Sequence, residues 1–196
     1  MPPMKVILAS ASPRRAEILT VAGIPFVVRA SKIDESRLPG ESPENMVERL
    51  ARAKAEDVAR ELLPAGPTII LGADTVVVVN GEILGKPGNA ATAREMLLKL
   101  RGREHRVITG FALLRVQHKQ IHVGHETTRV WFSEITDAEI DSYVATGEPF
   151  DKAGAYAIQG IAGRYIPRIE GCYFNVVGLP MARVWEAMKD LGWRTS

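Results

Sequence analysis

The pattern of apolar and polar positions predicts strands and helices that alternate along the first third of the chain. An apolar run over 6–9 predicts a buried strand, and the Ser-Pro pair that follows it predicts a helix over 13–22. Residues 25–29 predict a second strand. A second Ser-Pro pair, beginning at Ser42, predicts a longer helix with apolar side chains at helical spacing that ends near residue 63.

The remainder of the chain predicts strands joined by tight turns, together with three further helices. Asn80-Gly81 is typical of a type I′ hairpin, and Thr136 with Glu139 forms a capping box. The glycine-rich segment 148–163 has few periodic apolar residues and is predicted to be a functional loop. The expected strands are 68–71, 76–79, 82–84, 104–116, 120–132, 164–169 and 173–177, and the expected helices are 89–100, 136–147 and 180–191. This mixture indicates an α/β fold with a mixed sheet.

Composition limits the class of protein without defining its chemistry. The 196-residue chain is 46% hydrophobic and 24% charged, which suits one globular domain or a compact two-lobed one. A net charge of +2 gives no reason to expect a nucleic-acid or membrane partner, and no apolar run approaches the length of a bilayer span. The first residues lack a signal-peptide layout, so we expect a cytoplasmic protein. The single cysteine, Cys172, fits a reducing compartment, and we expect its thiol to be buried.

Four polar side chains gather where the first strand passes into the first helix. Ser10 and Ser12 flank the turn, and Ser12 is expected to cap the helix. Arg14 and Arg15 lie in the first helical turn, where the helix dipole disfavours cations. An anion such as phosphate would justify them, because a helix N-terminus offers free N–H groups to it. The alternative is two solvated arginines beside an ordinary cap.

A buried lysine and several acids add candidate chemistry. Lys54 falls on the apolar face of the second helix, where its ammonium either extends to the edge or meets an anion. Asp74 lies between two apolar strand segments, and Glu35 lies in the loop after the second strand. Magnesium usually requires one or two carboxylates plus substrate phosphates, so these acids suit a hard cation. Lys86, in a Gly/Pro turn, and the Asp151-Lys152 pair supply further charges.

Several common sites are absent from the sequence. It has no P-loop, no Rossmann glycine triplet after the first strand and no Gly-x-Ser-x-Gly elbow. The histidines have no zinc-site spacing and are expected at the surface or in the hairpin; they are His105, His118, His122 and His125. The three tryptophans are expected to pack rather than to stack on bases.

Five segments, taken in order, carry a family resemblance. They are Leu-Ala-Ser-Ala-Ser-Pro-Arg-Arg at 8–15, Gly-Ala-Asp-Thr at 72–75, Leu-Gly-Lys-Pro at 84–87, Asp-Lys-Ala-Gly-Ala-Tyr-Ala-Ile-Gln-Gly at 151–160 and Val-Gly-Leu-Pro at 177–180. Together they resemble the Maf-like nucleotide pyrophosphatases, and the similarity extends over about 6–191. Five segments in this order are more specific to one family than any single segment is.

The resemblance implies a fold and an activity. The fold would be a single domain over 1–196, with a long twisted mixed β-sheet flanked by helices, in two lobes with a central cleft, as in inosine triphosphatases. The protein would be a cytoplasmic, homodimeric hydrolase of phosphoric anhydrides that depends on a divalent cation, Mg or Mn. It would cleave nucleoside triphosphates between the α and β phosphates, giving a monophosphate and pyrophosphate, with no nucleic-acid or membrane partner.

The resemblance also implies roles for individual residues. Asp74 would activate water or hold the metal, and Glu35 would be a second acid at the metal. The residues expected to bind phosphates are Ser10, Ser12, Arg14, Arg15, Lys54, Lys86, Asp151 and Lys152.

The 151–160 segment resembles the branch of the family that acts on dTTP and UTP. The matching specificity positions are Arg14, Thr75 and Gln159, and a glutamine amide can match a pyrimidine edge that presents O4 and N3–H. Ala11 and Ala157 replace glycines common in the family, and each adds one methyl near the expected site. Two alternatives remain: a 7-methyl-GTP pyrophosphatase of the sister branch, and a non-catalytic nucleotide-binding regulator of septum formation.

Overall fold

The computed structural model describes residues 4–62 and 66–194. Its strands are β1 (Lys5–Leu8), β2 (Phe26–Val28), β3 (Thr68–Val79), β4 (Glu82–Leu84), β5 (Glu104–Arg115), β6 (Gln120–Trp131) and β7 (Arg168–Glu170). Its α-helices are α1 (Pro13–Val21), α2 (Pro43–Glu61), α3 (Ala90–Leu100), α4 (Asp137–Ala145), α5 (Tyr173–Val177) and α6 (Met181–Asp190). Short 3₁₀ turns are η1 (Val116–His118), η2 (Glu148–Asp151), η3 (Ala153–Ala155) and η4 (Ile161–Tyr165). Across the described ranges, no helix combines the length and apolar character that crossing a membrane requires.

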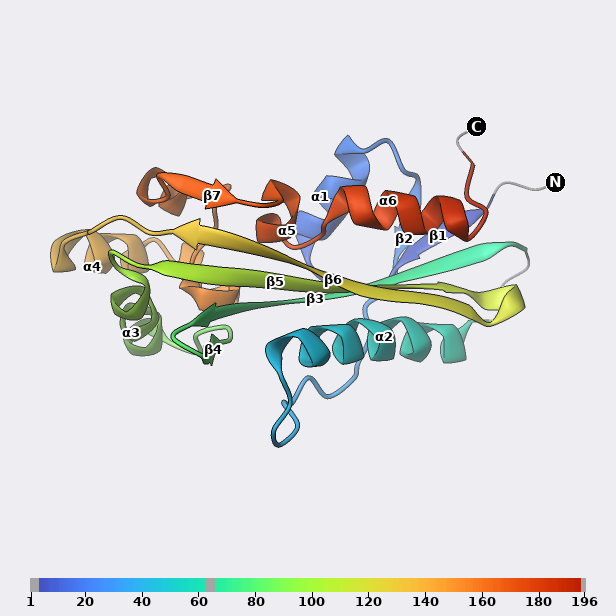
Figure 1. Ribbon diagram of the computed structural model, residues 1–196, viewed down its shortest axis with the longest axis horizontal. Helices are drawn as coiled ribbons and strands as arrows, with labels where there is room; N and C mark the ends of the chain where they lie inside the picture. Colours follow the sequence, from blue (N-terminus) through green and yellow to red (C-terminus); the bar gives the residue numbers. More distant parts are fainter. Residues whose placement is uncertain (1–3, 63–65, 195–196) are drawn as a thin grey trace. The chain divides into compact units, whose positions relative to one another are not determined.

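The strands form a mixed sheet, as the sequence predicts. Its order is β2-β1-β3-β5-β6-β7, and β4 pairs with β3 (Figure 1). β1 runs parallel to both β2 and β3, with Leu8 opposite Val28 on one side and opposite Leu71 on the other. The β3–β4 and β6–β7 pairs are antiparallel. The prediction of an α/β fold with a mixed sheet is therefore confirmed.

The chain divides into two compact units. Unit 1 comprises the described residues of Met1–Asp74, Thr109–Glu126 and Gly178–Ser196, and unit 2 comprises Thr75–Ile108 and Thr127–Val177. β3, β5 and β6 each contribute residues to both units. The predicted cleft between lobes, and the prediction of one domain over 1–196, stay predictions.

In unit 1, α2 lies against the sheet where two strands carry glycine. A Cβ at Gly72 of β3 would lie 2.0 Å from the carbonyl oxygen of Ala51, and a Cβ at Gly110 of β5 would lie 2.3 Å from that of Val47. Ala51 and Val47 are one helical turn apart on α2, so the two glycines together admit the helix backbone. Figure 1 shows α2 and α6 on opposite sides of this unit's strands.

The core of unit 2 is built largely from α3, α4 and the strand segments of that unit. Fully buried side chains include Leu97 and Leu100 of α3 and Ile140 and Tyr143 of α4. The expected capping box is present, because Thr136 Oγ1 accepts from the Glu139 backbone N–H and the Glu139 carboxylate accepts from the Thr136 backbone N–H.

The strand predicted over 173–177 is wrong, because these residues form helix α5. Asn175 is fully buried in this helix and donates from Nδ2 to Val107 O at 2.9 Å and to Thr128 Oγ1 at 2.9 Å. These tertiary contacts override the strand preference of the aromatic and β-branched side chains around it. The predicted strand 164–169 is also shorter, since residues up to Tyr165 belong to η4 and only β7 remains.

Three smaller predictions are also corrected. Cys172 is partly exposed rather than buried. His105 is 2% exposed rather than at the surface, with its Nε2 atom 2.6 Å from the Tyr156 hydroxyl. Ser12 occupies the N-cap position of α1, but its hydroxyl makes no capping hydrogen bond. Its backbone N–H instead donates to Ser10 Oγ at 3.2 Å.

Candidate functional site

Ser10 and Arg15 fix the start of α1 at the end of β1. Ser10 Oγ accepts from Arg15 Nη1 at 3.0 Å, and Arg15 Nε donates to the carbonyl oxygen of Gly178 at 2.8 Å. Both side chains belong to buried residues. Because Leu8 and Leu71 are paired in register, Ser10 and Asp74 both lie just beyond the parallel pairing of β1 with β3. The carboxyl ends of parallel strands are where open α/β sheets bind ligands.

The electrostatic environment of Arg15 shows which charges lie close to it. Burial lowers the pKa of Arg15, the charges of Asp74 and Glu35 oppose that shift, and the neighbouring charge of Arg14 adds to it. A guanidinium stays protonated in proteins, so Arg15 remains a buried cation. The predicted cations of α1 and the predicted acids therefore lie within electrostatic reach of one another.

Lys54 brings the two predicted acids together. Its Nζ atom lies 2.7 Å from Asp74 Oδ1 and 2.8 Å from Glu35 Oε1. The side chains of Lys54 and Asp74 are 7% and 11% exposed, whereas that of Glu35 is 53% exposed. The inward lysine predicted from helical spacing therefore meets an anion, and the anion is a pair of carboxylates of this same unit.

The loop that carries Glu35 is held in place by Arg49 of α2. Arg49 binds both carboxylate oxygens of Glu41, at 2.6 Å and 2.8 Å, and also donates to the carbonyl oxygen of Ser36 at 3.0 Å. Asp34 accepts from the Ser36 backbone N–H at 2.9 Å and tightens the turn next to Glu35. Arg49 and Glu41 could not be predicted from the sequence, since a bidentate pair between a helix and a loop leaves no spacing pattern.

The donors at this corner fit a divalent cation of the magnesium type. Two carboxylates, from Asp74 and Glu35, approach a single ammonium nitrogen, so both can approach one cation. Within 4–62 and 66–194, no group of three or more histidine, cysteine or acidic side chains is placed to hold a metal by itself. Magnesium usually keeps waters and binds through one or two carboxylates plus substrate phosphates, so two acids suffice.

The remaining predicted site residues lie in unit 2. Lys86 is exposed in the turn after β4. In that turn, the carbonyl oxygen of Gly85 accepts a hydrogen bond from the Gly154 backbone N–H at 3.0 Å. This contact brings the Lys86 turn beside the 151–160 segment. Lys152 Nζ donates to the Glu148 carbonyl oxygen at 2.7 Å and to Asp151 Oδ1 at 2.5 Å. Their phosphate roles stay predictions.

The 151–160 segment is shaped by left-handed backbone. Gly154 has φ +70°, and a Cβ there would lie 2.9 Å from Val77 Cγ2. Ala155 follows with φ +60°, a conformation that alanine rarely adopts. Gln159 is exposed, and Thr75 is half-buried on β3. Non-glycine residues persist in strained conformations where the surroundings fix them, as at ligand sites, and this agrees with a functional loop.

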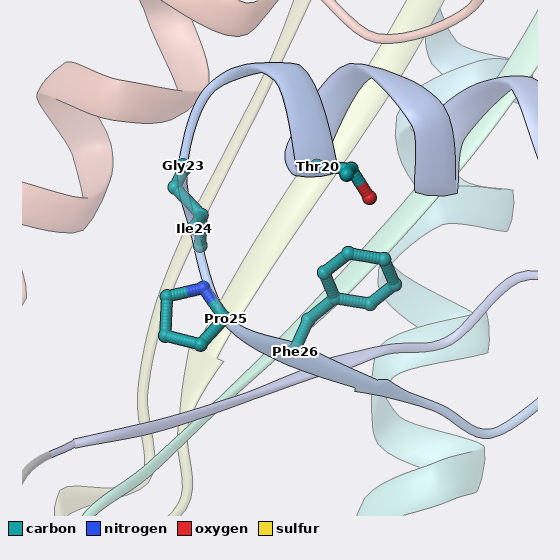
Figure 2. Close-up of a pocket in the computed structure, with 5 residues that line it drawn as sticks. All are labelled: Thr20, Gly23, Ile24, Pro25 and Phe26. Carbon is teal, nitrogen blue, oxygen red and sulfur yellow. The ribbon is translucent and has the colours of Figure 1, made fainter.

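One surface hollow lies elsewhere in unit 1. Figure 2 shows it at the connection between α1 and β2, with Phe26 and Pro25 among its lining side chains. The other lining residues are Thr20, Gly23 and Ile24. None of the five is charged, so this hollow does not offer the cations that a triphosphate requires.

These features define an α/β protein whose parallel strands end at a cluster of arginine, lysine and carboxylates, in which Arg15, Lys54 and Asp74 are buried and Glu35 is exposed. The family model described as "Maf-like protein" matches residues 5–191. The chain therefore belongs to the Maf-like protein family.

The comparisons also give named relatives. A protein of Geotalea uraniireducens, called dTTP/UTP pyrophosphatase, is 54% identical over 95% of this chain and 95% of its own length. One of Pelotomaculum thermopropionicum with the same name is 47% identical over 96% of this chain and 97% of its own. Among solved structures, the Ham1 protein of Staphylococcus aureus is 16% identical, with a TM-score of 0.46 over 65% of this chain and 71% of that one.

Proposed function

We propose that this protein is a nucleoside triphosphate pyrophosphatase that hydrolyses dTTP and UTP to the monophosphate and pyrophosphate. The observation that supports it best is the match to relatives of that name at 54% and 47% identity over nearly the whole chain. The charged corner of unit 1 supports the same chemistry, because hydrolysis of an anhydride needs a base for water and cations for the leaving phosphates.

Asp74 is the proposed base in this reaction. Its carboxylate takes a proton from water as the water oxygen attacks the α-phosphorus, and the bond from that phosphorus to the bridging oxygen breaks. Pyrophosphate leaves with the electron pair of that bond. Arg14, Arg15 and Lys54 stabilise the charge that develops on the phosphates.

Asp74 and Glu35 would also hold the divalent cation. A bound Mg or Mn ion would polarise the phosphate oxygens and lower the pKa of bound water. Lys54 already pairs with these two acids, at 2.7 Å and 2.8 Å, and lies on the same α2 helix as Arg49, which holds the Glu35 loop. The corner is thus preorganised for an anionic substrate that arrives with its own counter-cation.

A panel of nucleoside triphosphates tests the proposal through released pyrophosphate. We expect dTTP and UTP to be the best substrates with Mg or Mn, and little turnover of 7-methyl-GTP. Nucleotide binding without any pyrophosphate release would favour a non-catalytic regulator instead. A cytoplasmic location and a homodimeric state belong to the same proposal, and cell fractionation and light scattering test them.

Asp74→Asn tests the proposed base. We expect kcat to fall by about 10²–10⁴, the usual contribution of a general base, with the fold retained because the amide is isosteric and Lys54 keeps Glu35 as a counter-charge. Asp141→Asn is the matched control, since Asp141 is an exposed acid of α4 that pairs with Arg94 at 2.7 Å. Turnover of Asp74→Asn near that of the control would remove Asp74 from the mechanism.

A further inference from the structure

One carboxylate closes the segment that carries Gln159. Glu148 Oε1 accepts from the Tyr143 hydroxyl at 2.8 Å, and Glu148 Oε2 accepts from the Ile161 backbone N–H at 3.1 Å. Tyr143 lies in α4 and is fully buried. Glu148 lies three residues before the 151–160 segment and Ile161 directly follows it, so a single side chain links the two flanks of the segment to helix α4.

The backbone at the end of the segment packs directly on this carboxylate. A Cβ at Gly160 would lie 2.4 Å from Glu148 Oε1 and 2.5 Å from Oε2, so a larger residue there would displace the Glu148 carboxylate. Gly160 N donates to Ala157 O at 3.1 Å, which closes a tight turn with Gln159 at its third position. The Gln159 side chain is exposed. The turn that presents this amide is therefore seated on Glu148.

The Tyr143 hydroxyl also holds the Glu148 carboxylate in place. Burial, and then the hydrogen bond to Glu148, raise the pKa of Tyr143, so its hydroxyl remains protonated and continues to donate. The Glu148 carbonyl oxygen accepts from Lys152 Nζ at 2.7 Å, which fixes the start of the segment as well. All of these residues belong to unit 2.

We propose that Glu148 is a positioning residue that holds the Ala157–Gly160 turn so that the Gln159 amide can recognise the pyrimidine base. This inference rests on the proposed function and assigns Glu148 no contact with the nucleotide. Base recognition requires the amide in a fixed orientation. If the turn moved freely, the nucleotide would have to order it on binding, and the entropy cost would weaken binding. The proposed phosphate-binding residues of unit 1, among them Ser10, Arg15 and Lys54, take no part in these hydrogen bonds.

Kinetics separate this role from a general structural one. We expect Glu148→Ala to raise KM for UTP about tenfold, with kcat changed less than about threefold, because two hydrogen bonds to the turn and its anchor are lost. The preference for UTP over CTP should fall by a similar factor. Inhibition by inorganic triphosphate, which has no base, should be unchanged. Glu148→Gln keeps one acceptor oxygen and should show a smaller effect.

Glu95→Gln is the matched control, because Glu95 is an exposed acid of α3 in the same unit. Its kinetic constants should equal those of the wild type. An equal loss of kcat on UTP and CTP in the Glu148 variants, with KM unchanged, would overturn the positioning role.

Hydrogen exchange tests the tether without any turnover. We expect amides of 157–163 to exchange faster in Glu148→Ala, and in Glu148→Gln to a smaller degree, than in Glu95→Gln. Unchanged exchange in both Glu148 variants would overturn the inference even if the enzyme is active. Faster exchange with unchanged base preference would also overturn it, while leaving the proposed function intact. A wild-type protein that releases no pyrophosphate from UTP or dTTP would refute the proposed function, and the exchange data would still decide whether Glu148 holds the turn.

Discussion

Replacing Gly72 by alanine should displace α2 from β3 and disturb the Lys54–Asp74 pair. The added Cβ would lie 2.0 Å from Ala51 O and 3.0 Å from Ala55 N, both backbone atoms of α2. No side-chain rotation relieves such a contact. The helix or the strand has to move by more than about 1 Å before the methyl carbon reaches an ordinary contact distance.

The size of the effect follows from this geometry. Overpacked core substitutions usually destabilise a protein by about 1–3 kcal/mol. Because backbone atoms lie on both sides of this contact, we expect Gly72→Ala to cost about 3 kcal/mol, at the upper end of that range. Lys54 follows Ala51 on α2 by three residues, and Asp74 follows Gly72 on β3 by two. The displacement therefore reaches the charged corner, where a shift of about 1 Å can lower turnover about 10²-fold.

Urea unfolding and pyrophosphate release together measure this prediction. Gly88→Ala is the control for the loss of a glycine, since its Cβ would meet nothing within 4 Å and should change the free energy of unfolding by less than about 1 kcal/mol. Gly110→Ala should destabilise the protein as Gly72→Ala does, because its Cβ would lie 2.3 Å from Val47 O of the same helix. The double variant should lose less than the sum, since one movement of α2 relieves both contacts. Gly72→Ala with wild-type stability and turnover would refute this account of the α2 contact.

Two further predictions concern the Glu35 loop and a buried histidine. Arg49→Lys should lower turnover about tenfold in pyrophosphate release, because lysine cannot bind both Glu41 oxygens and the Ser36 carbonyl together; unchanged turnover would show that Glu35 does not depend on this contact. His105 has its pKa lowered by burial to about 4, from an ordinary value of 6.5, so the unfolded chain takes up the proton first and stability falls as pH drops from 6.5 towards 4. Urea unfolding at pH 7.5 and pH 5 should show that the free energy of unfolding falls by up to about 1.4 kcal/mol per pH unit. His105→Asn should reduce this pH dependence, whereas His118→Asn, in the exposed hairpin, should not. An equal pH dependence in all three proteins would contradict this assignment.

Element boundaries could be predicted from the sequence wherever the signal is local. Asn80 and Gly81 have φ +50° and +79°, as a type I′ turn requires, and the Ser42 hydroxyl caps α2 by accepting from Asn45 N at 3.1 Å. Asn89 caps α3 in the same manner, from Thr92 N at 2.9 Å. Such signals involve residues within four positions of one another, so they do not depend on the tertiary structure.

The errors occur where a distant contact decides. Nothing in the run 173–177 indicates that Asn175 binds Val107 and Thr128, and without those bonds the run resembles a strand. The sequence predicts His105 at the surface, whereas in the structure it is buried and contacts the hydroxyl of Tyr156, fifty-one positions away. Short runs and single polar residues carry too little pattern to predict such pairings.

The residues of the candidate site also divide into those with a local sequence signal and those that depend on a distant contact. Helical periodicity places Lys54 inward, and the family resemblance implies roles for Asp74 and Glu35, but their mutual contact joins three separate elements and could not be predicted from spacing. The supports of the site are less visible still. Arg49–Glu41 and Glu148–Ile161 are pairs of ordinary charged and apolar residues whose importance arises only from what they hold in place.

The Lys54 contacts also bear on how the proposed reaction begins. A buried carboxylate that loses a counter-charge destabilises the protein, so turning Lys54 from Asp74 towards a phosphate is unfavourable unless another cation replaces it, even with the charge of Arg15 close by. A free triphosphate brings only negative charge to the corner and would compete with the acids for the same ammonium. A triphosphate that carries a divalent cation brings both the anion for Lys54 and the cation for Asp74 and Glu35. We therefore expect the metal–nucleotide complex, rather than the bare nucleotide, to be the species that binds.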